Sequence, residues 1–166
     1  KISSVTKGQL DLSEHKYIAD TPQCRDQFSL RRGDVLMCRT NGTLAYVGMS
    51  ALVEEDIADT IFPDKVIRVR PDTSKIDPAF LWRLLQLPAL RRQIEGAART
   101  AVGNYAIGGK DIKQLKVPLP LIGDQASLVA ALNTARSQAL AKRAEAKALR
   151  ESAWTTFESS LFDAQA

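Results

Sequence analysis

The sequence has 166 residues and a mass of 18.2 kDa, with 45% hydrophobic and 25% charged residues, a composition typical of one globular domain with an extension. No apolar run approaches the roughly 18 residues of a membrane span, and the single histidine and two cysteines argue against a multi-histidine metal centre and a disulfide framework. The net charge of +4 comes entirely from residues 1–121, because residues 122–166 carry five bases and five acids.

Short apolar runs broken by Gly, Pro, Asn and Asp predict a mixed α/β (α+β) globule over residues 1–121. The expected strands cover residues 2–5, 34–39, 44–54 and 65–70. Asn41-Gly42 predicts a tight turn between the second and third of these strands. Pro78 begins an expected helix, Pro88 begins a second one that runs to about Ala97, residues 101–109 are interpreted as a Gly-rich loop, and residues 115–118 as a last short strand.

Residues 124–162 contain no Gly or Pro and predict one long helix, with Asp124 as its N-cap. At 1.5 Å per residue this helix would measure roughly 58 Å. Apolar and small residues recur in steps of four and three, which is typical of a coiled-coil seam that needs a facing helix. The seam residues are Leu128, Leu132, Ala135, Ala139, Ala146, Leu149, Ala153 and Phe157. We therefore expect two parts, a globular domain at 1–121 and a pairing or spacer helix at 122–166.

Signatures of catalysis are absent from the sequence. It has no P-loop, no dinucleotide fingerprint and no Asn/Asp-Pro-Pro-aromatic motif of an adenine methyltransferase. A nuclease site could be assembled only from Asp72 with Asp111 and Lys113, which are far apart in the sequence and lack a second carboxylate beside Asp111. We expect no catalytic residue, no metal and no cofactor.

Two segments carry side chains suited to nucleic acid. Arg and Asn can contact guanine and adenine edges, respectively, in a bidentate manner. Basic residues also outnumber acidic residues in the stretch 91–116. For Asn41, a purely structural role remains open, in which it adopts a left-handed turn conformation. The candidate DNA-binding residues are Arg39, Asn41 and Thr43 in the first segment, and Arg99, Thr100, Asn104, Tyr105, Lys110 and Lys113 in the second.

Several stretches, in their order and spacing, resemble the target-recognition domain of type I restriction-modification specificity subunits. The sequence departs from the usual pattern in two places: Ala106-Ile107-Gly108 stands where the family has Asn-Ile-Ser, and Asp124 replaces a Glu. The resembling stretches are Lys1-Ile-Ser-Ser-Val-Thr-Lys-Gly8, Arg32-Gly-Asp-Val-Leu-Met-Cys-Arg-Thr-Asn41, Val47-Gly48, Asp77-Pro-Ala-Phe-Leu-Trp82, Arg91-Arg-Gln-Ile94 and, most specific, the run from Asn104 to Gln125 that includes Pro118-Leu-Pro120.

The resemblance implies a non-enzymatic, cytoplasmic component that reads one half of a split double-stranded DNA target in the major groove. It also implies a long helix that spaces the half-sites, a methyltransferase subunit as partner, a restriction subunit as an indirect partner, and pairing with a second copy or a second half of the same subunit. The chain resembles one half of such a subunit. Two alternatives stay open: the recognition domain of a fused single-chain restriction-methyltransferase, and a protein-interaction adaptor that binds no DNA.

Overall fold

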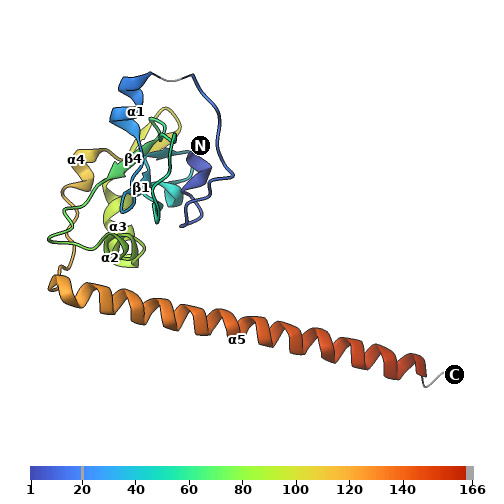
Figure 1. Cartoon of the computed structure of the whole chain (residues 1–166). Coiled ribbons are helices and arrows are strands. Elements are labelled where there is room, and N and C mark those ends of the chain that lie inside the picture. The colour runs from blue at the N-terminus through green and yellow to red at the C-terminus, as the bar shows by residue number, and fades with distance from the viewer. Residues whose placement is uncertain (20, 164–166) are drawn as a thin grey trace. The chain divides into compact units, whose positions relative to one another are not determined.

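The computed structural model describes residues 1–19 and 21–163, and it divides the chain into two compact units, Lys1–Ala126 and Ser127–Ala166 (Figure 1). The first unit holds two small antiparallel sheets and several short helices. The second consists of the greater part of one long helix. The fold class is the mixed α/β globule followed by a long helix that the sequence predicts.

The first sheet has the strand order β3-β1-β4, with β1 at Val35–Cys38, β3 at Ser50–Leu52 and β4 at Val66–Val69. All four residues of β1 are buried. Because successive side chains of a strand point to opposite faces, Leu36 and Cys38 pack into one apolar cluster and Val35 and Met37 into another. The strand therefore joins the two halves of the core.

The second sheet has the order β2-β6-β5, with β2 at Thr40–Asn41, β5 at Arg99–Ala101 and β6 at Asn104–Ala106. Arg39 connects the two sheets. Its backbone N–H donates to Lys65 O at 2.8 Å, beside β4, and its carbonyl accepts from the backbone N of Ile107 at 3.0 Å, beside β6. The chain thus passes from the core sheet into the second sheet without a loop.

Four short helices surround the sheets: α1 at Pro22–Phe28, α2 at Pro78–Leu85, α3 at Pro88–Ala97 and α4 at Gly109–Ile112. The first three begin with Pro, whose fixed φ suits the first helical position. The Asp77 carboxylate caps α2 by accepting from Phe80 N at 2.8 Å. Trp82 then fixes α2 on the core sheet, because its Nε1 donates to Ser50 O at 3.1 Å.

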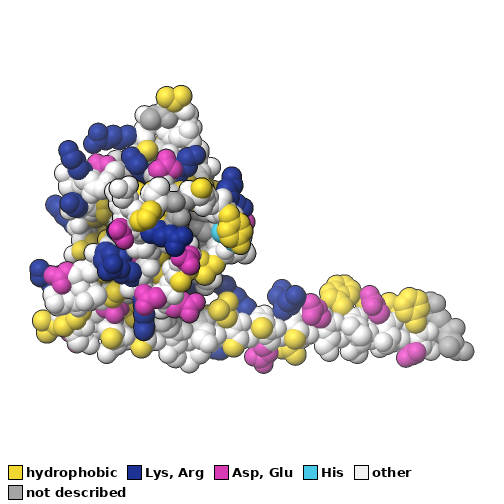
Figure 2. All heavy atoms as spheres, turned by 45° about the horizontal axis from the view of Figure 1, so that its top comes forward, with side chains coloured by type: hydrophobic (Ala, Val, Ile, Leu, Met, Phe, Trp, Pro, Cys, Tyr) yellow, Lys and Arg dark blue, Asp and Glu magenta, His cyan; other side chains and the backbone are white. Residues whose placement is uncertain are grey.

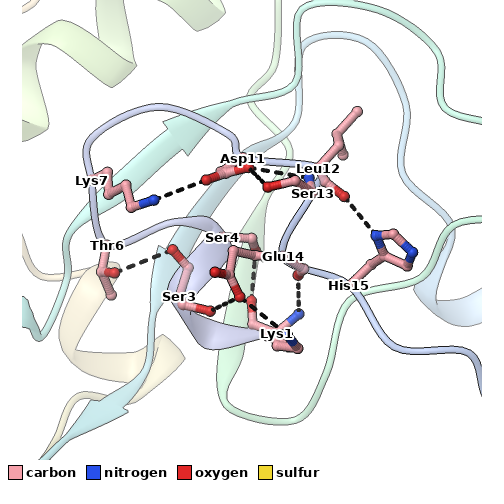
Figure 3. A network of polar contacts seen from close by, with 10 residues as sticks. All are labelled: Lys1, Ser3, Ser4, Thr6, Lys7, Asp11, Leu12, Ser13, Glu14 and His15. Atoms are coloured by element: carbon pink, nitrogen blue, oxygen red, sulfur yellow. Dashed lines mark hydrogen bonds and ion pairs between the residues drawn. The ribbon is translucent and has the colours of Figure 1, made fainter.

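The predicted strand at residues 2–5 is wrong, because this segment forms a 3-10 helix, η1, at Ile2–Ser4. Polar side chains hold the segment against residues 11–15 (Figure 3). Glu14 Oε2 accepts from Lys1 Nζ at 3.2 Å and from Ser3 Oγ at 2.9 Å. These side-chain hydrogen bonds stand where a strand would pair through its backbone. In the same network, hydrogen bonds from Ser13 and Lys7 lower the pKa of Asp11 to about 2.

The predicted strand at residues 44–54 is correct only in its second half. Residues Leu44–Tyr46 form a 3-10 helix, η2, and β3 begins at Ser50. The Asn41-Gly42 hairpin turn is also wrong. Strands β1 and β3 do pair, with Met37 opposite Ser50, but β2 and η2 lie between them in the chain. Carbonyl groups of residues 45 and 47, which a strand would use for pairing, instead accept from Arg91.

Two predictions in the second part of the globule also need correction. Residues 101–109, expected to be a loop, contain β6 and the end of β5. The expected strand at 115–118 does not form. There, the Gln93 side chain accepts from Lys116 N at 2.9 Å and donates to Lys116 O at 3.0 Å, and so takes both hydrogen bonds that a neighbouring strand would make.

Helix α5 covers Ile122–Asp163, 42 residues, which corresponds to about 63 Å. Asp124 lies in its first turn and is not the N-cap, because the helix begins two residues earlier. Gln125 is fully buried and holds the preceding chain: its Oε1 accepts from Asp77 N at 2.8 Å, and its Nε2 donates to Lys75 O and Pro120 O, each at 3.0 Å. No helix in the described part of the chain combines the length and the apolar character needed to cross a membrane.

Candidate nucleic-acid interface

The register of the second sheet brings the two predicted DNA-binding segments together. Asn41 of β2 lies opposite Tyr105 of β6, and Tyr105 lies opposite Thr100 of β5. Directly opposite residues of antiparallel strands share a face. Asn41, Tyr105 and Thr100 therefore form one row across three strands, although more than 50 residues separate Asn41 from the other two.

The other face of the sheet carries a different set. Thr40, Ala106 and Arg99 are paired across the strands, and Asn104 lies two residues before Ala106 on the same face. Arg99 and Asn104 are exposed, whereas Tyr105 on the first face packs partly against the core. The alternation thus divides the candidate residues of the second segment, with Arg99 and Asn104 on one face and Thr100 and Tyr105 on the other.

The turn that joins β5 to β6 consists of Val102 and Gly103, with φ of +45° and +75°. Positive φ at both central residues defines the type I′ turn, which matches the twist of paired strands and favours Asn, Asp or Gly. A β-branched residue in the left-handed region costs about 1–2 kcal/mol. The sequence does not predict this hairpin, because Val-Gly is not one of the dipeptides that are common at the centre of type I′ turns.

In the first segment, Asn41 shapes the chain through its side chain and not through a left-handed backbone. Among the described non-glycine residues, positive φ occurs only at Asp59 and Val102, so the proposed left-handed conformation of Asn41 is wrong. Its Oδ1 accepts from Thr43 N at 2.9 Å, which closes a local turn. Oδ1 keeps a second lone pair, but the hydrogen bond from Thr43 N fixes its orientation, which limits a two-ended contact to adenine.

Arg39 is exposed, and one of its guanidinium N–H groups is engaged, with Nη1 donating to Asp64 O at 3.3 Å. A guanidinium has five N–H donors. The remaining donors suffice for a bidentate contact to a base edge.

Helix α4 adds positive charge next to β5. Lys110 and Lys113 are both exposed, at the beginning and the C-cap of the helix. Arg99 Nη2 lies 3.4 Å from Asp111 Oδ1, while the other carboxylate oxygen of Asp111 accepts from Gly108 N at 2.9 Å. The Arg99 side chain is 83% exposed, so it remains open to solvent despite this ion pair. Figure 2 shows Lys and Arg side chains spread over the drawn face of the first unit, with acidic side chains between them.

Arg91 is one of the basic residues of the 91–116 stretch, and it holds the backbone that follows the first segment. The Arg91 guanidinium donates to Val47 O at 2.8 Å from Nη1 and to Ala45 O at 3.0 Å from Nη2, and pairs with Glu95 at 3.0 Å. These contacts attach η2 and the following residues to α3. Arg91 therefore positions residues 45 and 47, which follow the 39–43 segment, and no local sequence signal identifies it as a positioning residue.

No family model matches the sequence. It is 31% identical over 130 residues to the type I restriction enzyme EcoKI specificity subunit of Escherichia coli, which covers 78% of this chain and 28% of that protein. It is 25% identical over 135 residues to the putative type I restriction enzyme MjaX specificity subunit of Methanocaldococcus jannaschii, covering 80% of this chain and 31% of that protein. The chain belongs to the family of type I restriction enzyme specificity subunits. It spans less than a third of the length of these curated relatives.

The fold agrees with this family. A crystal structure of the HsdS subunit from Thermoanaerobacter tengcongensis matches 86% of this chain and 36% of that chain, with a TM-score of 0.63 and 21% identity. The resemblance deduced from the order of short motifs is thereby confirmed. It identifies the chain as a specificity-subunit domain followed by a long helix.

Among the described residues of this specificity-subunit domain, no group of three or more His, Cys, Asp or Glu side chains could hold a metal ion. The two carboxylates considered for a nuclease are engaged locally, Asp72 with Ser74 and Lys75, and Asp111 with Arg99 and Gly108. Burial raises the pKa of the Cys38 thiol to about 11. This thiol is protonated at neutral pH and is a poor nucleophile.

The predicted seam residues of the specificity-subunit helix lie on exposed turns of α5. Leu128, Leu132, Leu149 and Phe157 expose between 42% and 65% of their surface, and Figure 2 shows large hydrophobic side chains along this helix. Trp154, 66% exposed, packs edge-on against Phe157 at a centroid distance of 6.0 Å. It lies three residues before Phe157 and so widens the seam near its end, a feature absent from the predicted set.

Proposed function

We propose that this chain reads one half-site of a split double-stranded DNA target within a type I specificity subunit. The observation that supports this most directly is the register of the second sheet, in which Asn41, Tyr105 and Thr100 are neighbours. Two segments that lie far apart in the sequence are thus neighbours in one sheet, although their candidate residues occupy both of its faces. Membership of the family supports the same role.

In this proposal, the contacts divide into base reading and phosphate binding. Arg39 provides a guanidinium for a base edge, and Asn41 and Thr43 follow it on the same segment, with a smaller effect expected for Asn41 because its Oδ1 is committed to the turn. Arg99, Lys110 and Lys113 bind the phosphates beside the sheet, since point charges on exposed side chains position a duplex without reading it. Thr100, Asn104 and Tyr105 complete the contact set.

The proposed partners follow from the family. A methyltransferase subunit docks on this chain and modifies DNA, and a restriction subunit joins through it, so the chain contributes recognition and no bond-making step. Residues 1–121 are the proposed recognition domain and residues 122–166 the proposed spacer and pairing helix.

Arg39→Ala is expected to relax the preference at one base pair of the half-site, at a cost of about 1–3 kcal/mol in binding free energy.

Lys113→Ala is expected to weaken binding to all duplexes alike and to reduce the slope of log K against log salt by about 1. Fluorescence anisotropy with the full chain assembled with the methyltransferase subunit, on duplexes varied one position at a time, measures both effects.

The matched control is Lys147→Ala, which removes the same charge from an exposed, overall neutral part of the chain and should leave binding unchanged. An unchanged methylated sequence after exchange of both segments, 39–43 and 99–113, with those of another specificity subunit would refute the assignment. Binding of no duplex at any salt concentration would favour the adaptor alternative.

We also propose that the exposed seam of α5 pairs antiparallel with a second copy of this chain, or with the second half of the same subunit. An apolar stripe on a surface helix needs a cover, although Lys142 interrupts this stripe between Ala139 and Ala146. Light scattering of the isolated chain at tens of micromolar is expected to give a dimer, and Leu132→Glu with Leu149→Glu is expected to give a monomer. Leu140→Glu, 63% exposed and off the seam, is the control that stays dimeric. A monomeric parent chain would count against pairing.

A further inference from the structure

The side chain of Val102, at the tip of the β5–β6 hairpin, is not packed inside the domain. It is 101% exposed, the most exposed of the large hydrophobic side chains in the described part of the chain. Its backbone has φ +45°, a conformation that β-branched residues avoid. The hairpin therefore holds an apolar, conformationally unfavourable residue where Asn, Asp or Gly would fit the turn better.

The surroundings of Val102 indicate what could use it. The strands on either side carry Thr100, Asn104 and Tyr105, and Arg99 stands at the base of β5. A two-stranded β-ribbon fits the major groove of B-form DNA, which is about 12 Å wide. A ribbon with polar sides and a single apolar tip would bring that tip closest to the base edges.

We propose that Val102 enters the major groove and contacts the C5-methyl group of a thymine in the recognised half-site, an inference that rests on the proposed function. The thymine methyl is the apolar group that the major groove presents, and apolar side chains recognise it by van der Waals contact and water exclusion. Val102 thereby discriminates thymine from cytosine and from uracil at one position. In this backbone conformation, the two methyl groups of Val102 lie at the outermost point of the hairpin.

The test replaces each thymine of the half-site, one at a time, by deoxyuridine, which removes only the methyl group. The protein is the full chain assembled with its methyltransferase subunit, and the half-site is first identified from the DNA that the complex methylates. One deoxyuridine substitution is expected to weaken binding by the parent protein about 3- to 5-fold, the effect of one buried methyl group. Val102→Asn, which suits the left-handed turn and carries no methyl group, is expected to lose this response at the same position.

Two further variants keep the outcome unambiguous. Val102→Gly relieves the backbone and should not unfold the domain, so a lost deoxyuridine response in this variant, with an unchanged or higher Tm, supports direct contact. Ile18→Thr alters a β-branched residue that is 64% exposed on another segment, and should retain the parent response.

Specific binding with identical deoxyuridine responses in the parent and in Val102→Asn, or a half-site without an A·T pair, would overturn the inference while leaving the proposed function intact. Absence of sequence-specific binding by the parent complex would overturn both.

Discussion

Replacing Arg70 by Met is expected to lower the free energy of unfolding by about 2–4 kcal/mol. Asp34 is 1% exposed, and both of its carboxylate oxygens accept from Arg70, at 2.7 Å from Nε and 2.8 Å from Nη2. Removal of one partner from a buried pair leaves an uncompensated charge, which costs about 3–5 kcal/mol when both partners are buried. The Arg70 side chain is 40% exposed, so we expect a smaller loss than for a pair in which both partners are buried. Urea denaturation measures the change.

Two comparisons separate the buried charge from the general loss of an ion pair. Lys75→Met breaks the Lys75–Asp72 pair, whose side chains are 73% and 56% exposed, and should change stability by less than about 0.5 kcal/mol. Asp34→Asn combined with Arg70→Met removes the buried charge and should recover part of the loss. A double variant less stable than Arg70→Met alone would contradict this explanation.

Gly48→Ala is expected to destabilise the domain by a similar amount, about 2–4 kcal/mol, because it combines two costs. Gly48 has φ +73°, and a Cβ at this position would lie 2.4 Å from Ile94 Cγ2, a fully buried side chain of α3. Nη1 of Arg91, which holds the carbonyl of Val47, also lies 3.3 Å from that Cβ. We therefore expect a lower midpoint in thermal unfolding and weaker DNA binding in the same variant.

The variants Gly103→Ala and Gly96→Ala separate the cost of the backbone conformation from the cost of the contact with Ile94. Gly103 has a similar φ of +75° but nothing within 4 Å, so its Ala variant should lose only about 1 kcal/mol. Gly96 lies in α3 without neighbours within 4 Å, and Ala there should raise stability by up to about 1 kcal/mol. Equal losses for Gly48→Ala and Gly103→Ala would show that the contact with Ile94 carries no cost.

The two sheets are directly connected in the chain. The core sheet is fixed by buried β1, and the chain continues directly through Arg39 into β2 of the second sheet. We therefore expect a disturbance of α3 or of the turn at Gly48 to affect the proposed base-reading residues. We expect variants of Arg91 to reduce affinity even though its guanidinium is used inside the fold.

Local pattern alone determined two strands of the core sheet, the proline-initiated helices and the long C-terminal helix. The apolar run at 34–39 and the alternation of apolar and basic residues at 65–70 predicted β1 and β4, and Pro78 and Pro88 marked the first residues of α2 and α3. The absence of Gly and Pro after residue 123 predicted most of α5. In these segments one local preference dominates, so no distant contact is needed to decide the structure.

The tertiary structure decided what depends on partners distant in the sequence. Glu14 turned residues 2–4 into a 3-10 helix, Gln93 occupied the backbone of Lys116, and Arg91 drew the carbonyls before β3 out of strand pairing. The sequence supplied the side-chain chemistry of the two candidate DNA-binding segments, but not their adjacency. Strand register, a long-range property set by packing and not by propensity, placed Asn41 beside Tyr105 and raised Val102 to the tip of a hairpin.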